Sequence, residues 1–472
     1  MKIVIIGCGI AGLSAGYRLC NSNEVLIFEK DKEIGGMAAS CARKNAEKSY
    51  FIEKYYHHIF RSDSELLALI KELKLEDKML WLEAKNGYFV EGKAYPMNTP
   101  LEILRFKPLS VFDLMRLGFM VLKIKTIKDT VPYDKIKAKD WIIKTTGSQV
   151  YENFFAPLMK SKFGDNADKI SAAWLIGRVK IRSDRGIEGE KLGYMRGGFN
   201  ALVETLAGEI KAKGGSIMQN TPVSKIIIKD NTVQGVLING DFVACDAVIS
   251  TVEPKVLDAL ITGSTNPKDK TSLQANKNLQ ANKNLQKKEK AQENATLQET
   301  QQEKLHEILC NIRYQGTACA LLGLDRKLMP DGTYWLNVKA DVPFGAVIEH
   351  TNFLPIEDYG EHLVYLASYF QDEKDPRYFR KEEEVLDSYL SGLEKLFPAF
   401  SRKEVRWKKL FRRLDTAPVY EQGYLEKVLP EVSGIKGLYL AGMFSPENYP
   451  ERSINGSVKA GFECASLLGN ST

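Results

Sequence analysis

The chain has 472 residues, of which 44% are hydrophobic, and it carries a formal net charge of +6. This length exceeds what one hydrophobic core usually supports, so we expect two or three domains. The small net charge, with no basic run interleaved with aromatic residues, argues against nucleic acid as a partner, and the absence of an apolar run of about 18 residues argues against a membrane-spanning helix.

The number and spacing of the cysteines indicate the redox environment of the protein and whether it holds a metal. The seven cysteines are spread along the chain without a CxxC pair, and the five histidines do not cluster with them. An odd, unpatterned set in a long chain is typical of reduced thiols, so we expect a cytoplasmic protein. The same scatter predicts no zinc or iron site.

A glycine pattern follows the first apolar run of the chain. After residues 1–6, Gly7, Gly9 and Gly12 form a GxGxxG pattern that opens a helix-like stretch, and Glu29 ends a second apolar run. In such a unit the first glycine allows a sharp turn, the second lets a pyrophosphate approach the backbone, and the third lets helix and strand pack closely. The helix N-terminus supplies free N–H groups and a partial positive charge for a diphosphate. The pattern therefore predicts a dinucleotide site.

Glu29 narrows the choice of dinucleotide. It stands 22 residues after Gly7, where a carboxylate can accept hydrogen bonds from both hydroxyls of an adenosine ribose. A 2′-phosphate at that place would disrupt these bonds, which argues against NADP. A GxGxxG pattern alone is weak, but the preceding strand, the acid at this distance and the pair Gly35-Gly36 together make it specific.

Residues 28–36, FEKDKEIGG, resemble the second half of the FAD signature of the FAD-dependent amine oxidoreductase superfamily, which includes monoamine oxidases, protoporphyrinogen oxidases and phytoene desaturases. In that superfamily the glycine pair lets the chain pass close to the cofactor. Asp31 stands where a basic residue is common, and Met37 where an arginine usually follows the glycines. These two departures disfavour the amine-oxidising branch.

Two later segments extend the resemblance over most of the chain. Residues 193–199, followed by an amphipathic stretch and Gly214-Gly215, look like the family's return to the cofactor domain, where Val223 meets the adenine end through its backbone. Residues 437–443 read as a strand that runs into a glycine turn, and residues 453–461 open the last helix. In the family this helix directs its N-terminus at the pyrimidine edge of the isoalloxazine, where a reduced flavin carries negative charge.

The resemblance implies FAD as the cofactor and a set of residues that bind it. No cysteine or histidine lies between Gly442 and Ser457 to form a covalent bond with the flavin, so we expect non-covalent FAD. The predicted cofactor-binding residues are Gly7, Gly9, Ile10, Ala11, Gly12, Glu29, Lys30, Gly35, Gly36, Met37, Val223, Gly442, Met443, Asn455, Gly456, Ser457 and Val458.

The expected architecture is of the α/β class: a Rossmann-type FAD-binding domain, with a parallel sheet and helices on both faces, and an inserted α+β substrate domain. The FAD-binding domain would be discontinuous, formed by residues 1–85, 190–261 and 411–472, and the substrate domain by 86–189 and 305–410. Strand-like runs at 316–324, 334–338, 345–349 and 363–370 predict a sheet that floors a pocket. Residues 262–304, which contain a tandem ANKNLQ repeat, read as a solvated low-complexity insertion.

Residues 55–60, YYHHIF, are the main candidates for catalysis because they place two imidazoles among aromatic groups soon after the FAD signature. Tyr56, His57 and His58 are the predicted catalytic residues, and either histidine could hydrogen-bond the flavin or relay a proton. In the alternative interpretation, one histidine faces solvent and the other is a satisfied core residue. The predicted substrate residues are Trp174, Arg178 and Tyr194.

The stretch from Arg105 to Lys128 carries six basic residues and one acid among many apolar ones. Basic flanks on a nearly all-round apolar helix suit a peripheral contact with a membrane surface. A helix of the substrate domain that covers a tunnel is the interpretation we favour.

These features lead to one main functional hypothesis and two alternatives. The main one is an FAD-dependent oxidoreductase, similar to protoporphyrinogen oxidases and phytoene desaturases, that dehydrogenates a lipophilic or cyclic small molecule by hydride transfer to flavin N5. The first alternative is a flavin-dependent nucleotide-sugar isomerase that resembles UDP-galactopyranose mutase, in which Arg178, Arg182 and Arg196 would grip a diphosphate. A non-enzymatic flavin-bound scaffold is disfavoured, because none of the cofactor segments is visibly damaged.

Overall fold

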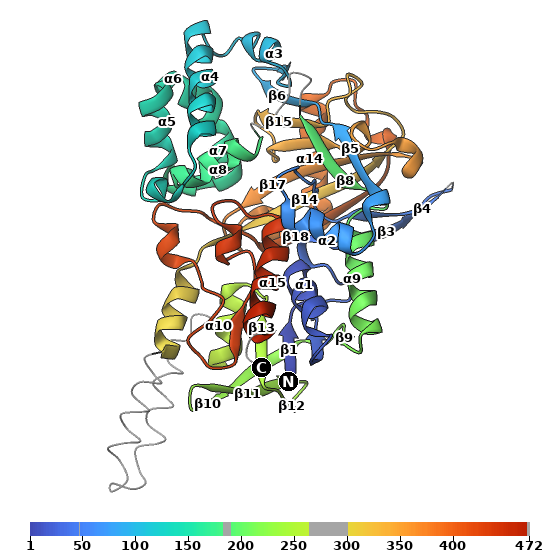
Figure 1. Ribbon diagram of the computed structural model, residues 1–472. Helices are drawn as coiled ribbons and strands as arrows, with labels where there is room; N and C mark the ends of the chain where they lie inside the picture. The colour runs from blue at the N-terminus through green and yellow to red at the C-terminus, as the bar shows by residue number, and fades with distance from the viewer. Residues whose placement is uncertain (47, 183–189, 264–300, 470–472) are drawn as a thin grey trace, which may run out of the picture. The chain divides into compact units, whose positions relative to one another are not determined.

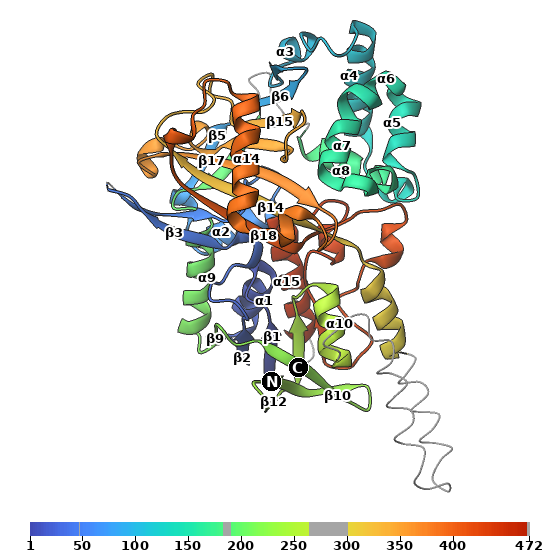
Figure 2. The ribbon, with the colours of Figure 1, turned by 180° about the vertical axis from the view of Figure 1, so that it is seen from behind.

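The computed structural model describes residues 1–46, 48–182, 190–263 and 301–469. The chain forms two compact units (Figures 1 and 2). The first unit consists of Met1–Gly36, Val203–Arg313 and Lys427–Thr472, and the second of Met37–Leu202 and Tyr314–Glu426. Both units are therefore discontinuous in sequence.

The first unit is built on a five-stranded parallel sheet. Its strand order is β19 (Leu438–Leu440), β13 (Ala247–Ser250), β1 (Lys2–Ile6), β2 (Glu24–Phe28) and β9 (Ser216–Met218). The central strands are continuous apolar runs with almost every residue buried, as expected for parallel strands covered on both faces. The Rossmann-type fold that the sequence predicts is thereby confirmed.

The described elements around this sheet are helices and a small antiparallel sheet. The helices are α1 (Ile10–Leu19), α9 (Asn200–Ala212), α10 (Pro254–Thr262) and α15 (Ile454–Gly469), and residues 301–311 are also helical. The antiparallel sheet consists of β10 (Val223–Lys229), β11 (Thr232–Ile238) and β12 (Asp241–Ala244). Its two turns, Asp230-Asn231 and Asn239-Gly240, have positive φ at both residues, which suits two-residue hairpins.

The second unit contains a seven-stranded mixed sheet. Its strand order is β18 (Val405–Pro418), β14 (Tyr314–Leu324), β17 (His362–Phe370), β16 (Ala346–Glu349), β15 (Trp335–Lys339), β6 (Asn86–Val90) and β7 (Lys93–Pro96). The four predicted strand runs correspond to β14–β17 and are confirmed. Helix α14 (Glu382–Leu396) lies across one face, seen from the front in Figure 2, and buries Leu386, Tyr389 and Leu393 in the core of this unit.

The remaining elements of the second unit are mostly helical. They are the hairpin strands β3 (Ser40–Lys44) and β4 (Ser49–Glu53), the paired strands β5 (Met79–Glu83) and β8 (Lys191–Met195), and the helices α2 (Ser64–Glu72), α3 (Pro100–Leu104), α4 (Val111–Thr126), α5 (Ala138–Thr146), α6 (Ser148–Val150), α7 (Ala156–Phe163), α8 (Ala172–Arg182) and α13 (Pro376–Phe379). Helices α4 to α8 gather in one helical group (Figure 1). None of the helices within the described residues is long and apolar enough to cross a membrane.

The boundaries of the two units differ from the predicted domain limits. Residues 37–85, 190–202 and 411–426 belong to the second unit rather than to the FAD-binding unit. The reason is long-range strand pairing: β5 pairs with β8, and β18 continues as one strand along β14 up to Pro418. Most of the predicted insertion, residues 264–300, lies outside the described residues, and residues 301–304 begin the helix that precedes β14.

Candidate functional site

The candidate cofactor site lies at the carboxyl edge of the parallel sheet in the first unit. Strands β1, β13 and β19 are parallel, so their carboxyl ends share this edge. Helix α1 begins four residues after β1, and α15 follows β19, so the N-termini of both helices lie at the same edge. Ligands of doubly wound α/β folds bind at this edge, where helix N-termini attract anionic groups.

The glycine turn has the geometry that the sequence predicts. Gly7 has a φ of +100° and donates its N–H to the carbonyl of Phe28 at 2.8 Å. A Cβ on Gly12 would lie 2.1 Å from the Gly7 carbonyl oxygen, so only glycine fits. Gly9 is the extended residue that precedes α1, and no side chain caps the first turn at Ile10 and Ala11. The backbone N–H groups of this turn are therefore suited to a diphosphate.

The carboxylate of Glu29 is buried and held beside this turn. Its Oε2 accepts a hydrogen bond from the N–H of Cys8 at 2.8 Å, and its Oε1 accepts one from the N–H of Asp31 at 3.0 Å. A carboxylate has about four lone-pair sites, so acceptor capacity remains for the hydroxyls of a ribose. The N–H of Thr221 donates to the carbonyl of Glu29 at 2.8 Å, which fixes the segment that leads to Val223 beside it.

The pair Gly35-Gly36 packs directly against the glycine turn. Gly35 donates its N–H to the Cys8 carbonyl at 2.8 Å, and a Cβ on Gly36 would lie 3.1 Å from the Cα of Gly9. Both glycines have positive φ. Of the other predicted residues in this stretch, Lys30 is exposed, and Met37 is the first residue of the second unit.

The C-terminal segment is organised by a buried asparagine that the sequence did not single out. Asn448 donates from Nδ2 to the Gly442 carbonyl at 2.9 Å and accepts from the N–H of Ser453 at 3.0 Å. The Oγ of Ser453 accepts from the N–H of Gly456 at 2.9 Å at the start of α15. This network links the Gly442 turn to the predicted residues at the start of α15, which are Asn455, Gly456, Ser457 and Val458, while Met443 follows the turn. A serine three residues before a glycine at a helix start is the sequence signal that could have identified this cap.

In the second unit the structure places the predicted catalytic residues in an aromatic cluster. The ring of Tyr56 lies 4.8 Å from that of Trp335, and its hydroxyl lies 2.7 Å from the hydroxyl of Tyr369. The ring of His58 lies 6.2 Å from that of Trp335. The Nδ1 of His57 lies 2.7 Å from the Tyr55 carbonyl oxygen, to which it donates. This bond selects the tautomer with the hydrogen on Nδ1, so Nε2 is the proton-accepting nitrogen.

The charge state of His58 follows from its surroundings. Burial, with Arg182, Arg178 and His57 nearby, holds the pKa of His58 well below its usual range, so this imidazole is neutral at pH 7. It therefore acts as a neutral hydrogen-bonding group rather than as a cationic acid. Arg178 is one of the predicted substrate residues. Its positive charge contributes to the low pKa of His58, which places it near the aromatic cluster.

The other two predicted substrate residues belong to the packed interior of the second unit. Trp174 is buried and meets Phe163 edge to face at 4.7 Å. Tyr194 is fully buried, and its hydroxyl donates to the Oε2 of Glu53, whose Oε1 accepts from the N–H of Phe199 at 2.6 Å. Burial raises the pKa of Glu53. Tyr194 therefore satisfies a buried carboxyl group, and neither residue lines the cavity described next.

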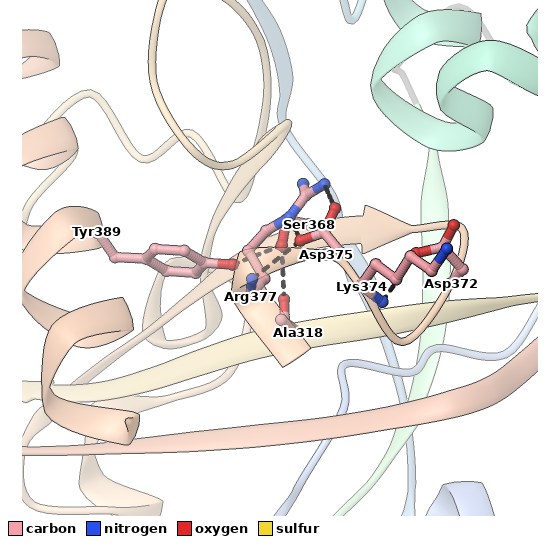
Figure 3. Close-up of polar contacts among 7 residues, drawn as sticks. All are labelled: Ala318, Ser368, Asp372, Lys374, Asp375, Arg377 and Tyr389. Atoms are coloured by element: carbon pink, nitrogen blue, oxygen red, sulfur yellow. Dashed lines mark hydrogen bonds and ion pairs between the residues drawn. The ribbon is translucent and has the colours of Figure 1, made fainter. Parts of the chain in front are cut away.

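The second unit contains a cavity of about 820 Å³. Its lining includes Tyr369, whose hydroxyl meets Tyr56, and it is formed by residues 156–165, 338–345 and 368–377. Figure 3 shows part of its polar wall, where the side chains of Arg377 and Asp375 point toward one another and Lys374 and Asp372 lie in the loop after β17. These residues are scattered over three distant segments, so no local sequence signal identifies the cavity.

The polar wall is held by a bidentate ion pair and a hydroxyl chain. Arg377 donates from Nε and Nη2 to the two carboxylate oxygens of Asp375 at 2.8 and 2.6 Å. Burial alone would raise the pKa of Asp375, but the hydrogen bonds of Arg377 bring this pKa below its usual value. Ser368 donates to the carbonyl of Ala318 at 3.1 Å and meets the Tyr389 hydroxyl at 2.5 Å (Figure 3).

We compared the chain with models of known protein families. The model of the family described as flavin containing amine oxidoreductase matches residues 10–468. The chain belongs to this family. The description of this family agrees with the prediction of an FAD-dependent oxidoreductase.

Among curated relatives, coproporphyrinogen III oxidase of Staphylococcus aureus is 28% identical over 263 residues, which cover 48% of this chain and 55% of the relative. The 15-cis-phytoene desaturase of Synechococcus elongatus is 22% identical over 55% of this chain and 60% of the relative. The matched segments thus span little more than half the length of these two proteins.

Solved structures of the same fold cover nearly the whole chain. A structure described as a protoporphyrinogen oxidase from Exiguobacterium sp. 255-15 aligns with a TM-score of 0.72 and 15% identity, covering 100% of this chain and 99% of that one. Reduced UDP-galactopyranose mutase aligns with a TM-score of 0.70 and 16% identity, covering 100% and 96%. At such identities these likenesses show the fold alone.

The residues of the first unit fit FAD. The first turn of α1 has no side-chain cap and can offer its N–H groups to a diphosphate. The Glu29 carboxylate retains acceptor capacity beside it, and Asn448 holds the segment between Gly442 and the start of α15. When bound, FAD supplies an acceptor for a hydride from a substrate. The chain supplies the binding groups and the electrostatic environment.

Proposed function

We propose that this flavoprotein dehydrogenates a lipophilic or cyclic small molecule. The observation that carries the proposal is the aromatic cluster around Tyr56, which packs against Trp335 at 4.8 Å and Tyr365 at 6.2 Å. Aromatic walls with a few placed polar groups are typical of sites for apolar and planar ligands. The names of two relatives, a coproporphyrinogen oxidase and a phytoene desaturase, support the same substrate class.

The cavity of the second unit is a suitable size for such a substrate. Its volume of about 820 Å³ falls within the range of about 300–1,000 Å³ that small-molecule sites occupy. Apolar residues such as Val338 and Phe344 line it together with Lys160, Lys339 and Lys374. The lining also carries Asp165 and Asp372, so a polar ring substituent would find charges of both signs there.

In this proposal the chain's own residues orient the substrate and move a proton. His57, with its Nδ1 hydrogen bonded to the Tyr55 carbonyl, presents Nε2 as the base. Neutral His58 and the Tyr56–Tyr369 hydroxyl pair supply hydrogen bonds without a charge. These four side chains are only partly buried, so a substrate can reach them.

The alternative of a nucleotide-sugar isomerase needs cations that grip a diphosphate together. Arg178 and Arg182 both lie near His58, and the guanidinium of Arg182 lies 5.7 Å from the centre of the Trp335 ring. Arg196 instead lies 3.8 Å from Asp358 and is largely exposed. This arrangement favours the dehydrogenase over a three-arginine clamp.

Product analysis tests the proposed substrate class. The FAD-loaded enzyme is incubated with a porphyrinogen, with phytoene and with UDP-galactopyranose, each in the presence of oxygen or a quinone. We expect oxidised product from the porphyrinogen or phytoene, and a rate lowered by about 10² in His57→Ala. His362→Ala, a partly buried histidine outside the aromatic cluster, is the matched control. UDP-galactopyranose is also incubated without oxygen with the dithionite-reduced enzyme, and isomerised sugar from that incubation, with no oxidised product from the other substrates, would overturn the proposal.

We also propose that α4 contacts an anionic membrane surface. One stripe of this helix is buried, with Leu114, Leu117, Met120 and Ile124. A second apolar stripe faces outward, and its exposed fractions range from 63% to 75% over Val111, Phe112, Met115, Phe119 and Leu122. Lys123, Lys125 and Lys128 are exposed at the end of the helix. An outward apolar stripe with basic flanks is the arrangement of interfacial helices.

Vesicle sedimentation tests this contact. We expect the protein to bind vesicles with phosphatidylglycerol more strongly than neutral phosphatidylcholine vesicles, and the double variant Phe112→Ser/Phe119→Ser to lose binding by about tenfold or more. Phe379→Ser, which removes a phenylalanine of similar exposure from α13, is the control. Equal binding by the double variant and the control would contradict the proposal.

A further inference from the structure

Three residues with metal-binding side chains meet on the first unit, and none of them is among the predicted cofactor-binding residues. They are Asp258 on α10 and His306 and Cys310 on the helix of residues 301–311. Their ligand atoms all lie within 4.8 Å of one another. Figures 1 and 2 show the second helix, drawn in yellow, beside α10.

The local fold explains why these side chains converge. His306 and Cys310 are four residues apart, so they project from the same face of their helix, one turn apart. Asp258 is buried, and it directs one carboxylate oxygen to each partner: Oδ1 lies 2.5 Å from the Nδ1 of His306, and Oδ2 lies 3.8 Å from the Sγ of Cys310. His306 and Cys310 are more exposed, so an ion can reach the group from solvent.

We propose that Asp258, His306 and Cys310 form a binding site for Zn²⁺, with water as the fourth ligand. Carboxylate, imidazole and thiolate are the three side-chain ligand types of zinc sites. Tetrahedral bonds of about 2.0–2.3 Å place ligand atoms about 3.3–3.6 Å apart. The Sγ of Cys310 lies 3.8 Å from both Asp258 and His306, close to that separation.

Metal entry requires only small local changes. The Nδ1–Oδ1 contact between His306 and Asp258 would widen by about 1 Å, from a hydrogen bond to the edge of a coordination tetrahedron. The ion would replace the hydrogen on Nδ1 of His306, and the neutral imidazole would carry its hydrogen on Nε2 instead. The thiol proton of Cys310 would pass to solvent. Side-chain rotations on two adjacent helices can provide this movement.

A cysteine nucleophile activated by His306 is the competing interpretation of the same three residues. Activation needs a hydrogen bond from the thiol to one imidazole nitrogen while Asp258 orients the other. The Sγ of Cys310 is instead equidistant, at 3.8 Å, from both ring nitrogens. The geometry fits a shared ion better than a catalytic pair.

Such a site would link α10 to the helix of residues 301–311 through the bound ion. Asp258 and His306 are 48 residues apart in sequence, and a metal link across a long loop removes conformational freedom from the unfolded chain. Zinc binding would therefore stabilise the first unit without taking part in the flavin reaction.

Cobalt titration tests the proposal directly. Tag-free holoprotein, reduced with a phosphine, is titrated with Co²⁺ and observed at the red end of the visible spectrum, clear of the flavin absorption. We expect one Co²⁺ per chain, with the d–d bands of a tetrahedral sulfur-containing site, and displacement by one equivalent of Zn²⁺. Cys310→Ser and His306→Gln should each weaken binding by at least about tenfold.

Glu307→Gln is the matched control, because it removes a charged, exposed residue from the same helix without touching the group. Its affinity should equal that of the wild type, and the flavin content and circular dichroism of every variant should be unchanged, which shows that the fold is intact. Absence of saturable binding, or equal binding in Cys310→Ser and the wild type, would overturn the zinc site.

Discussion

At the residue scale, Glu29 is the side chain whose role in FAD binding is most directly testable. Its carboxylate is buried beside the glycine turn and accepts hydrogen bonds from the N–H groups of Cys8 and Asp31. We expect Glu29→Ala to weaken FAD retention by about 1–3 kcal/mol, since a charged acceptor is lost. Equilibrium dialysis measures this affinity, and release of the yellow cofactor on denaturation shows that it is non-covalent. Unchanged retention would exclude Glu29 from the site.

His350 makes the stability of the protein dependent on pH. It is buried, its Nε2 lies 2.9 Å from the Tyr359 hydroxyl, and burial lowers its pKa to about 3. In the unfolded chain a histidine titrates near 6.5, so below that pH the unfolded state binds a proton that the folded state does not. Stability is therefore complete above pH 6.5 and falls by up to about 2 kcal/mol from this group between pH 6.5 and 5.

Denaturant unfolding of the wild type and of His350→Gln over this pH range measures that contribution. Burial raises the pKa of Glu349 to about 7, which acts in the opposite direction, so the comparison rests on the difference between the two curves. We expect the variant to lose stability less steeply as the pH falls. Parallel curves would contradict the assignment of the acid sensitivity to His350.

The site residues that could be predicted from the sequence are the glycines that form tight backbone turns. Gly7, Gly12 and Gly36 are required by positive φ or by a close backbone approach, and a spaced glycine pattern reveals such requirements. Asn448 was not predicted, because its partners Gly442 and Ser453 only become its neighbours when the segment folds back. The grouping of Asp258 with His306 was missed for the same reason.

At the scale of elements, the packing of α1 against α15 sets the positions of both helix N-termini. A Cβ on Gly461 would lie 2.4 Å from the Ala11 carbonyl oxygen and 2.9 Å from the Cβ of Ser14. Because backbone cannot move aside easily, we expect Gly461→Ala to destabilise the first unit by about 1–3 kcal/mol and to weaken FAD retention.

Gly208→Ala on α9 is the control for that prediction. No atom lies within 4 Å of a Cβ at this position, so alanine should stabilise the helix by up to about 1 kcal/mol. Thermal unfolding of both variants provides the measurement. A melting temperature that rises in both would show that the contact between α1 and α15 is not tight.

Strands that show as apolar runs in the sequence were predicted well. The faces of a helix that contact other elements were not, because the sequence does not show which neighbours a helix has. The runs that became β14 to β17 were recognised from their apolar residues, and in the structure most of their residues are buried. For the helix α4 the sequence shows apolar residues all round, and only the structure separates the buried stripe of Leu117 from the exposed stripe of Phe119. The interpretation that we favoured from sequence, a tunnel cover, does not account for the exposed stripe.

At the scale of the whole molecule, the sequence predicted two discontinuous units but not their limits. The strand β5 follows the FAD signature closely in sequence, yet it pairs with β8, more than 100 residues later, in the second unit. Pairings of this length leave no local trace, and the same is true of the cavity, whose walls come from three segments. Membership of the family and the α/β fold, in contrast, followed from short motifs near the two chain ends.

Anaerobic mixing of the oxidised holoenzyme with a porphyrinogen or phytoene tests the central claim most directly. If the protein is a dehydrogenase, one equivalent of substrate bleaches one equivalent of oxidised flavin, and oxygen or a quinone restores the colour. We predict this result with the lipophilic or cyclic substrate and no bleaching with UDP-galactopyranose. Turnover of the nucleotide sugar only after reduction of the enzyme with dithionite, with no bleaching by any other substrate, would contradict the account.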